Sequence, residues 1–283
     1  MEILAAVILG IIQGLTEFLP VSSSAHLILV PWIAGWKPEG LMFDVSLHVG
    51  TALAILAFFW SDWIELAGEV LRGIAEGNPL GNPKRRLAWF LVIGTLPAMA
   101  VGLTLEKTVE DSLRSPLVTV FTLVAFGILL YAAERMSRME RSLDLFSWGD
   151  SIWIGLSQAV ALIPGVSRSG ITISTALLRN AERSAAARFS FLLSTPIIVG
   201  AGVLECWHFI KALRHPSLIT AGAGVVEIKW GVLAAGIISA AVVGFLCIRY
   251  FLRYIQNNSF VPFVIYRFLL ALVVLTLYLR HGG

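Results

Sequence analysis

The chain has 283 residues, a mean hydropathy of +0.83 and a net charge of +3, with 57% hydrophobic and 14% charged residues. Soluble domains are nearer half apolar and a quarter charged, so this composition excludes a soluble globular protein and indicates an integral membrane protein. The mild positive charge predicts no nucleic-acid partner, and the two cysteines have no metal-binding spacing. The N-terminus lacks the positive segment of a signal peptide, so we expect it to belong to the mature fold.

Six apolar segments are long enough to cross a bilayer, which takes about 20 residues of helix. Two further apolar segments, residues 2–35 and 150–180, are interrupted by proline and polar residues. Irregular backbone at membrane depth survives only where it is buried in protein or lines a wet cavity. We therefore predict that each interrupted segment is a re-entrant helical hairpin with an inward tip, in preference to one kinked helix. The six predicted spans are residues 45–71, 87–106, 116–134, 186–210, 229–252 and 260–280.

The two interrupted segments resemble each other. GIIQGLTEFLPVSSSAHLI (10–28) and GLSQAVALIPGVSRSGITI (155–173) share Gly-x-x-Gln, an apolar stretch, a proline and a serine cluster. A second match relates residues 86–106 to residues 188–205. Two matches in the same order indicate an internal repeat.

Each predicted half holds one hairpin and three spans, with repeat 1 over about 1–140 and repeat 2 over about 150–283. An odd number of crossings makes the second half enter from the opposite side. The expected fold is one all-α membrane domain with an inverted-topology repeat, six transmembrane helices and two re-entrant hairpins. Such folds place their site at the repeat interface near the midplane, where we expect the two tips to meet.

Lysine and arginine residues are more numerous on one predicted side of the membrane, which includes Arg86 and Arg138. The positive-inside rule assigns this side to the cytoplasm. Both chain termini are then expected to face outward.

The first hairpin carries a carboxylate inside an apolar segment. Gln13 and Glu17 are four residues apart, so they share one face of a helix. An ionised carboxylate in the bilayer costs at least about 2.5–3.5 kcal/mol, so Glu17 should face a wet cavity, a cation or a buried partner. The alternative is an interfacial glutamate near the end of the helix.

A cluster of hydroxyls and an imidazole follows Pro20. It consists of Ser22, Ser23, Ser24 and His26. The serines alone could simply cap the next helix. A helix start also offers free N–H groups that suit phosphate, and histidine can act as an acid, a base or a nucleophile.

The second hairpin carries Arg168 between two glycines. Gly165 and Gly170 permit tight turns and close backbone approach, and the guanidinium of Arg168 matches phosphate bidentately. The structural alternative is a salt bridge between Arg168 and Glu17, which would leave the neighbouring hydroxyls unexplained. Together the two tips indicate a phosphoryl-transfer site. The hydroxyls of the second tip are Ser167, Ser169 and Thr172.

Arg267 lies inside the last predicted span. It is either a second anion contact or the partner of a buried acid, and we expect a structural or secondary role.

At these residues the sequence resembles a known family. QGLTEFLPVSSSAH closely resembles the (E/Q)GLTEFLPVSSTGH signature of the undecaprenyl pyrophosphate phosphatase family, also called BacA or UppP, and PGVSRSGITIS resembles its PGxSRSxxT signature. FSFLLSTP and SFVPFVIYRF are similar to its downstream blocks, and the resemblance runs from about residue 5 to 275. It implies hydrolysis of undecaprenyl pyrophosphate to the monophosphate, which recycles the lipid carrier of cell-wall synthesis and is associated with bacitracin resistance. It also implies a bacterial plasma (inner) membrane, an outward-facing site and a divalent cation, Mg²⁺ or Ca²⁺.

The resemblance assigns roles to particular residues. Glu17, Ser23, His26 and Arg168 are implied to be catalytic, and Glu17 is implied to be the cation ligand. Because Gln13 stands at the first acidic position of the family motif, a metal held by two carboxylates is not expected. Ser23, His26 and water stay open as the attacking group. The residues expected to bind substrate are Gln13, Ser22, Ser24, Gly165, Ser167, Ser169, Gly170 and Thr172.

Two other functions share features with this sequence. A transporter or flippase of a phosphorylated polyprenyl lipid is the alternative, because inverted repeats with broken helices are a transporter trait. The second is a lipid phosphatase of the PSGH type, to which PVSSSAH is faintly similar. That type needs a histidine several residues after its Ser-Arg pair, and the sequence has none after Ser167-Arg168, which disfavours this function. The expected partners are a polyprenyl pyrophosphate, membrane lipids and a second copy in a homodimer.

Overall fold

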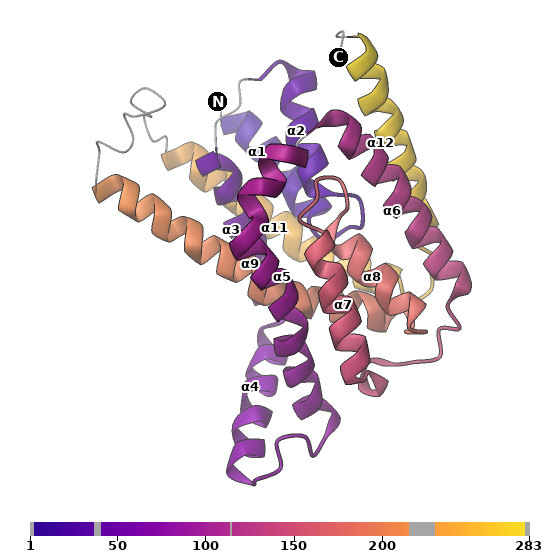
Figure 1. Ribbon diagram of the computed structural model, residues 1–283. Coiled ribbons are helices and arrows are strands. Elements are labelled where there is room, and N and C mark those ends of the chain that lie inside the picture. Colours follow the sequence, from indigo (N-terminus) through magenta and orange to yellow (C-terminus); the bar gives the residue numbers. More distant parts are fainter. Residues whose placement is uncertain (1–2, 37–40, 114, 215–229, 281–283) are drawn as a thin grey trace.

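The computed structural model describes residues 3–36, 41–113, 115–214 and 230–280, and no strand occurs in these ranges. The all-helical class expected from the sequence is therefore confirmed for the described part of the chain (Figure 1). The helices are α1 (Ile3–Thr16), α2 (Ser23–Ala34), α3 (Leu41–Phe58), α4 (Trp60–Ala75), α5 (Pro83–Leu113), α6 (Pro116–Met136), α7 (Trp148–Val160), α8 (Arg168–Leu178), α9 (Arg183–Arg214), α11 (Trp230–Tyr254) and α12 (Val261–Arg280), with a 3-10 turn at Leu143–Leu145.

Within the described ranges, five single helices contain a stretch long and apolar enough to cross a membrane. These stretches are Pro83–Thr104, Pro116–Met136, Arg183–Leu204, Trp230–Tyr254 and Val261–Arg280. They correspond to five of the six predicted spans, and the chain is a multi-pass membrane protein.

The sixth predicted span, residues 45–71, differs from the expectation of one helix. It consists of two helices, Phe43–Phe58 and Trp60–Ala75, which meet at a bend of 66°. After the bend, α4 carries charges that pair with the start of α5: Glu65 bonds Lys84, and Glu69 accepts from Arg85 Nε at 3.1 Å. These pairs hold α4 beside the start of α5, where it extends away from the other spans (Figure 1).

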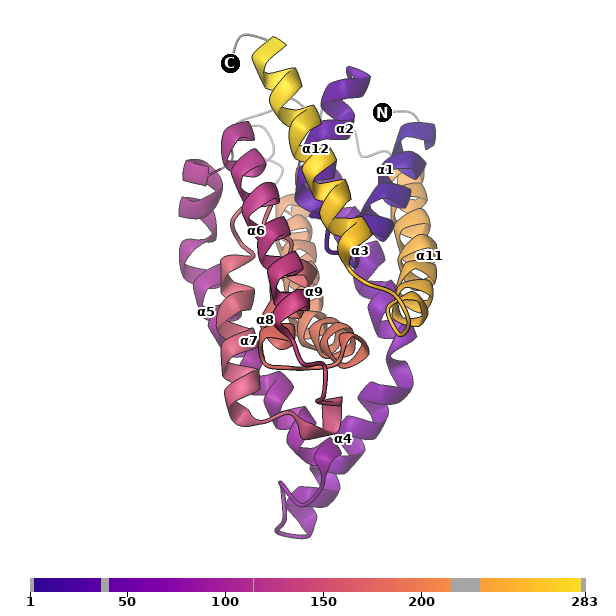
Figure 2. The ribbon, with the colours of Figure 1, turned by 90° about the vertical axis from the view of Figure 1, so that its right-hand side faces the viewer.

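The two predicted hairpins are α1–α2 and α7–α8. They enter from opposite ends of the molecule, as Figure 2 shows. Each hairpin packs against the other half of the chain, because α1 lies on α11 and α7 lies on α5. The α7–α5 contact is close enough that a Cβ at Gly155 would lie 2.4 Å from the Gly94 carbonyl oxygen. This reciprocal packing is the arrangement expected of an inverted repeat.

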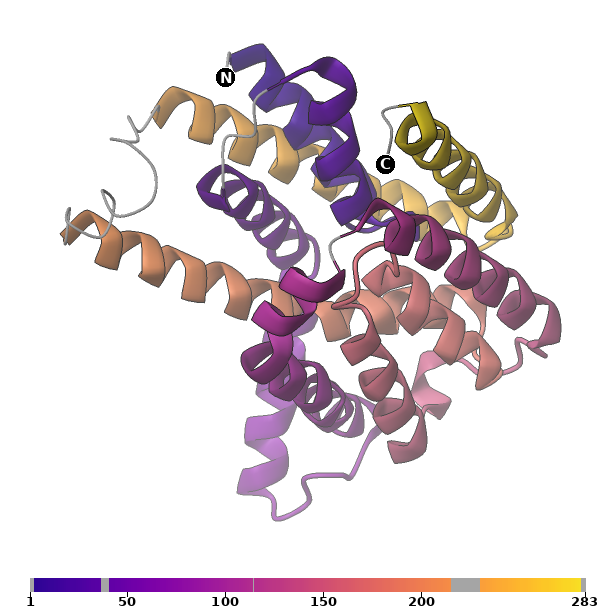
Figure 3. The same ribbon diagram turned by 45° about the horizontal axis from the view of Figure 1, so that its top comes forward.

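Helices α6 and α12 hold equivalent places at the end of each half, and they pack side by side (Figure 3). The second sequence match does not follow this order. Residues 86–106 lie in α5, the second span after the first hairpin, whereas residues 188–205 lie in α9, the first span after the second hairpin. The support for the repeat therefore comes from the match between the two hairpins and from the order of the helices.

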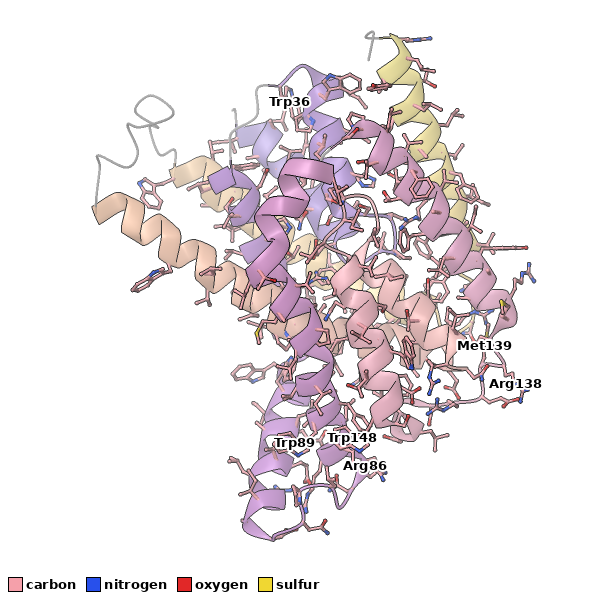
Figure 4. All side chains as sticks on the ribbon, viewed as in Figure 1. Trp36, Arg86, Trp89, Arg138, Met139 and Trp148 are labelled. Carbon is pink, nitrogen blue, oxygen red and sulfur yellow. The ribbon has the colours of Figure 1, made fainter. Side chains whose placement is uncertain are left out.

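Two arginines assigned to one predicted side of the membrane lie at the same end of the molecule. Arg86 and Arg138 lie at one end, and Trp36 lies at the other (Figure 4). At the arginine-rich end, the buried Asp150 lies in the first turn of α7 and accepts from Arg141 Nη2 at 2.7 Å and from Arg179 Nε at 2.8 Å. Burial would raise the pKa of Asp150, but the hydrogen bonds from Arg141, Arg179 and Ser147 outweigh it and lower the pKa to about 2. Asp150 thus stays ionised near neutral pH and clamps the base of the second hairpin.

Candidate functional site

The two hairpin tips turn at equivalent serines. Ser22 has φ 73° and Ser167 has φ 71°, a backbone region that non-glycine residues rarely adopt. Such conformations cost of order 1–3 kcal/mol each and cluster at functional sites. In each tip the serine hydroxyl meets the serine two residues on, at 3.1 Å for Ser22–Ser24 and 3.3 Å for Ser167–Ser169. The sharp turns place Ser23 and Arg168 at the first positions of α2 and α8.

Ser23 and Arg168 converge on Glu17 from the two tips. The Ser23 hydroxyl donates to Glu17 Oε2 at 2.8 Å, and Gln13 Nε2 donates to the same oxygen at 3.1 Å. The Arg168 guanidinium bonds the other oxygen of Glu17 through Nη2. The carboxylate therefore holds a hydroxyl, an amide and a guanidinium in one buried cluster.

The structural alternative for Arg168, a salt bridge to Glu17, is present in this structure. It does not conflict with phosphate binding, because the contact engages Nη2 and a guanidinium has five N–H donors. The Arg168 side chain is also 18% exposed, against 6% for Glu17. Arg168 can thus meet an incoming anion while Glu17 stays covered.

His26 is held at both ring nitrogens. Its Nδ1 lies 2.7 Å from the carbonyl oxygen of Ser22, and its Nε2 lies 2.6 Å from the hydroxyl of Tyr266. The two rings are nearly parallel, with an interplanar angle of 4° and centroids 5.5 Å apart. His26 is therefore buried beside the first tip, with one partner at the N-cap of α2 and the other on α12.

Arg267 has the structural role expected from the sequence, but its partner is not a buried acid. Its fully buried guanidinium pairs with no acid among the described residues and donates to backbone carbonyls instead. These oxygens come from both hairpin tips and from α6, so one side chain joins three elements. The acceptors are Leu123 (3.0 Å), Pro20 (3.3 Å), Val166 (3.1 Å), Thr122 (3.1 Å) and Gly165 (3.0 Å).

Gly165 has a structural reason to be glycine. Its φ is +87°, and a Cβ there would lie 2.1 Å from Thr122 Oγ1. Thr122 itself donates to the carbonyl of Pro164 at 2.7 Å. The second tip is thus fitted against α6.

The other residues expected to bind substrate differ in burial and in their hydrogen-bond partners. Ser169 donates to the Leu19 carbonyl at 3.0 Å and so ties the second tip to the first. Thr172 is fully buried, and its hydroxyl lies 2.6 Å from that of Ser190. Gly170 N donates to the Ser167 hydroxyl at 3.2 Å, and Ser24 is exposed. The hydroxyls of Ser169 and Thr172 thus hold the framework of the site in this structure.

The oxygen donors near Glu17 decide whether a divalent cation could bind there. Among the described residues, no group of three His, Cys, Asp or Glu side chains could hold a metal by itself. However, Gln13 Oε1 is buried with no hydrogen-bond partner, one helical turn before Glu17. Mg²⁺ commonly binds one or two carboxylates together with substrate phosphates. Glu17 and Gln13 Oε1 are oxygen donors that fit a cation shared with a diphosphate.

Two residues near the site were missed in the sequence. Tyr266 contacts His26, and His48 of α3 lies close enough to interact electrostatically with Glu17. Tyr266 lies next to Arg267 in the block SFVPFVIYRF, but the sequence gives no sign of what an aromatic residue in a spanning helix faces. The one available signal for His48 was an ionisable side chain in a predicted span.

Fold and site together define a helical membrane protein whose two re-entrant tips bring a serine, a carboxylate and an arginine together. The family model described as bacitracin resistance protein BacA matches residues 6–273. The chain belongs to this family.

Three proteins that are similar to the chain over its length are named undecaprenyl-diphosphatase. The undecaprenyl-diphosphatase of Desulforudis audaxviator is 48% identical over 277 residues, which cover 98% of each chain. That of Moorella thermoacetica is 45% identical over 285 residues, covering 99% of this chain and 100% of the relative. That of Nitrosococcus oceani is 41% identical over 278 residues, covering 98% and 100%.

Proposed function

We propose that the chain hydrolyses undecaprenyl pyrophosphate to undecaprenyl phosphate and inorganic phosphate. This activity would recycle the lipid carrier for cell-wall synthesis and confer resistance to bacitracin. Membership of the BacA family and the names of full-length relatives support the reaction. The structural observation that supports it most directly is that Ser23 and Arg168, which come from two separate hairpins, both bond the carboxylate of Glu17.

The geometry favours Ser23 as the attacking group. A nucleophilic hydroxyl needs a base within hydrogen-bond reach, and Glu17 Oε2 lies 2.8 Å from Ser23 Oγ. Both nitrogens of His26 are engaged elsewhere, with Ser22 and Tyr266.

The reaction then has two steps. Ser23 Oγ attacks the terminal phosphorus while Glu17 accepts its proton. The bond from that phosphorus to the bridging oxygen breaks, and undecaprenyl phosphate leaves with the electron pair. In the second step, water attacks the phosphoserine and keeps its protons in the released inorganic phosphate. Glu17 returns its proton to the Ser23 oxygen, which restores both residues.

Arg168 and the free N–H groups at the starts of α2 and α8 hold the terminal phosphate and stabilise its developing charge. A bound Mg²⁺ or Ca²⁺ would neutralise part of the diphosphate charge. Glu17 and Gln13 are the residues that would hold it.

Phosphate release from a prenyl pyrophosphate by purified protein in detergent tests the proposal. We expect the Ser23→Ala variant to lose about 10²–10⁴-fold in rate, because the nucleophile is gone. Acid quenching of the wild type should yield a phosphoserine that maps to Ser23 and is absent from Ser23→Ala. A parallel reaction with a chelator, then with Mg²⁺ or Ca²⁺ restored, reports the need for a cation.

Thr276→Ala is the matched control, because this hydroxyl is exposed on α12 and bonds only the Leu272 carbonyl. A wild type that releases no phosphate in detergent would contradict the phosphatase and favour the transporter, although no relative reported above is named for transport. A full rate for Ser23→Ala would instead assign the attack to water or His26.

We also propose that the protein lies in the bacterial plasma membrane with its site open to the outside. The support is the arginine-rich end marked by Arg86 and Arg138, which the positive-inside rule assigns to the cytoplasm. With the native cysteines replaced by serine, Trp36→Cys should react with an impermeant maleimide in intact spheroplasts. Arg86→Cys should react only after permeabilisation, and the reverse pattern would overturn the orientation. A homodimer stays a prediction.

A further inference from the structure

Tyr266 of α12 contacts the candidate catalytic histidine from a helix that is remote in sequence. Its hydroxyl lies 2.6 Å from His26 Nε2, and the two rings are nearly parallel. We infer that Tyr266 is a positioning residue that fixes where His26 carries its proton. The inference rests on the proposed phosphatase only for its effect on turnover.

The hydrogen-bond partners of His26 decide its tautomer. The Ser22 carbonyl can only accept, so the Nδ1 atom at 2.7 Å must carry a hydrogen and donate it. A neutral imidazole then has its lone pair on Nε2, and the Tyr266 hydroxyl donates to it. His26 held in this way has one tautomer and one ring orientation, with Nδ1 donating to Ser22 and Nε2 accepting from Tyr266. Fixing one tautomer by a second hydrogen bond is how proteins orient reactive imidazoles.

Tyr266 is itself held in place by its neighbour in the sequence. Arg267 binds carbonyls of both hairpin tips and of α6, so this turn of α12 is pinned directly behind the site. The Tyr266 hydroxyl therefore reaches His26 from a rigid support. Reactive groups need such support to keep a productive geometry.

The inverted repeat provides an internal comparison. The offset that relates the two hairpin tips, and the first residues of α6 and α12, gives Ile171 as the counterpart of His26 and Phe121 as the counterpart of Tyr266. Neither counterpart can hold a titrating proton. The imidazole and the phenol are thus both present in one half and both absent from the other, as expected if they work as a unit.

Tyr266 is also 43% exposed, whereas His26 is 5% exposed. A half-exposed aromatic ring on a membrane helix needs no hydroxyl for packing against lipid. The hydroxyl is therefore explained by His26 and not by the core.

Tyr266→Phe removes the hydroxyl and keeps the ring. We expect kcat for phosphate release to fall about tenfold with KM unchanged, because His26 holds the carbonyl of Ser22, the residue next to the attacking Ser23. In a His26→Ala background, the same change should have no further effect, because Tyr266 acts through His26. Tyr250→Phe, on the exposed face of α11, is the matched control and should retain the wild-type rate.

Nitrogen-15 NMR of histidine-labelled protein in detergent gives a readout that does not need turnover. The wild type should show His26 as the single Nδ1–H tautomer, and Tyr266→Phe should show exchange between the two tautomers. The inference would be overturned if Tyr266→Phe lowered the rate equally in the wild type and in the His26→Ala background. An Nε2–H tautomer of His26 in the wild type would also overturn it. A wild type with the expected tautomer but no phosphate release would refute the proposed function and leave the Tyr266 contact standing.

Discussion

Glu17→Gln is expected to lower kcat for phosphate release by about 10²–10⁴-fold, the usual contribution of a general base. Glutamine keeps the size of the side chain and can still accept the Ser23 hydrogen bond, but it cannot take the proton. The variant separates the chemical role of Glu17 from its shape. The rate of single-turnover phosphate release is the measurement.

The same change should not weaken substrate binding, because the carbonyl oxygen of glutamine can still serve a bound cation. Glu17 neutralises Arg168 in the present structure, so a neutral residue 17 leaves the guanidinium unpaired and available to the diphosphate. KM should therefore stay level or fall while kcat collapses. A raised KM with an unchanged kcat would contradict the role as a base and would point to Glu17 as a holder of substrate through a cation.

Glu65→Gln is the control for the removal of a carboxylate. Glu65 is exposed in α4 and pairs with Lys84 at the arginine-rich end, away from the hairpin tips. Surface ion pairs contribute at most about 1 kcal/mol to stability. We expect this variant to melt and to turn over like the wild type.

The hairpins and their tips could be predicted because their signals are local. Pro20 and Pro164 interrupt apolar runs, and serines follow each proline. The likeness of the two runs then implied two tips entering from opposite faces. The meeting of Ser23, Glu17 and Arg168 followed from that symmetry, since inverted repeats place their sites where the halves meet.

The rest of the site depends on contacts that carry no sequence signal. The partners of Arg267 are backbone carbonyls, and any residue type supplies a carbonyl. Tyr266 looks like any other aromatic residue in a spanning helix until α12 is placed against α2. The bend between α3 and α4 falls in LAFFWSDWI, where no proline or glycine marks it.

Arg267→Met is expected to have the largest effect on folding. Methionine fills much of the same volume but has no N–H, so carbonyls of Pro20, Gly165 and Val166 lose a buried donor. Each buried group left unsatisfied costs about 1–3 kcal/mol. A total of roughly 3 kcal/mol would lower the melting temperature by roughly 6–12 °C in a chain of this size, as measured by intrinsic fluorescence in detergent. Arg267→Lys should recover only part of the loss, because three donors on one nitrogen cannot serve carbonyls on three elements.

Arg253→Met is the matched control, since Arg253 is exposed in the last turn of α11. An Arg267→Met variant that melts and turns over like Arg253→Met would contradict the role given to Arg267. The expected loss has a specific consequence for activity, because Arg267 bonds Pro20 in the first tip and Gly165 in the second. Ser23 comes from one tip and Arg168 from the other, so their common contact with Glu17 depends on how the tips are held. Activity should therefore fall at temperatures well below the melting point of the variant, because a shift of about 1 Å between reacting groups can cost 10²-fold in rate.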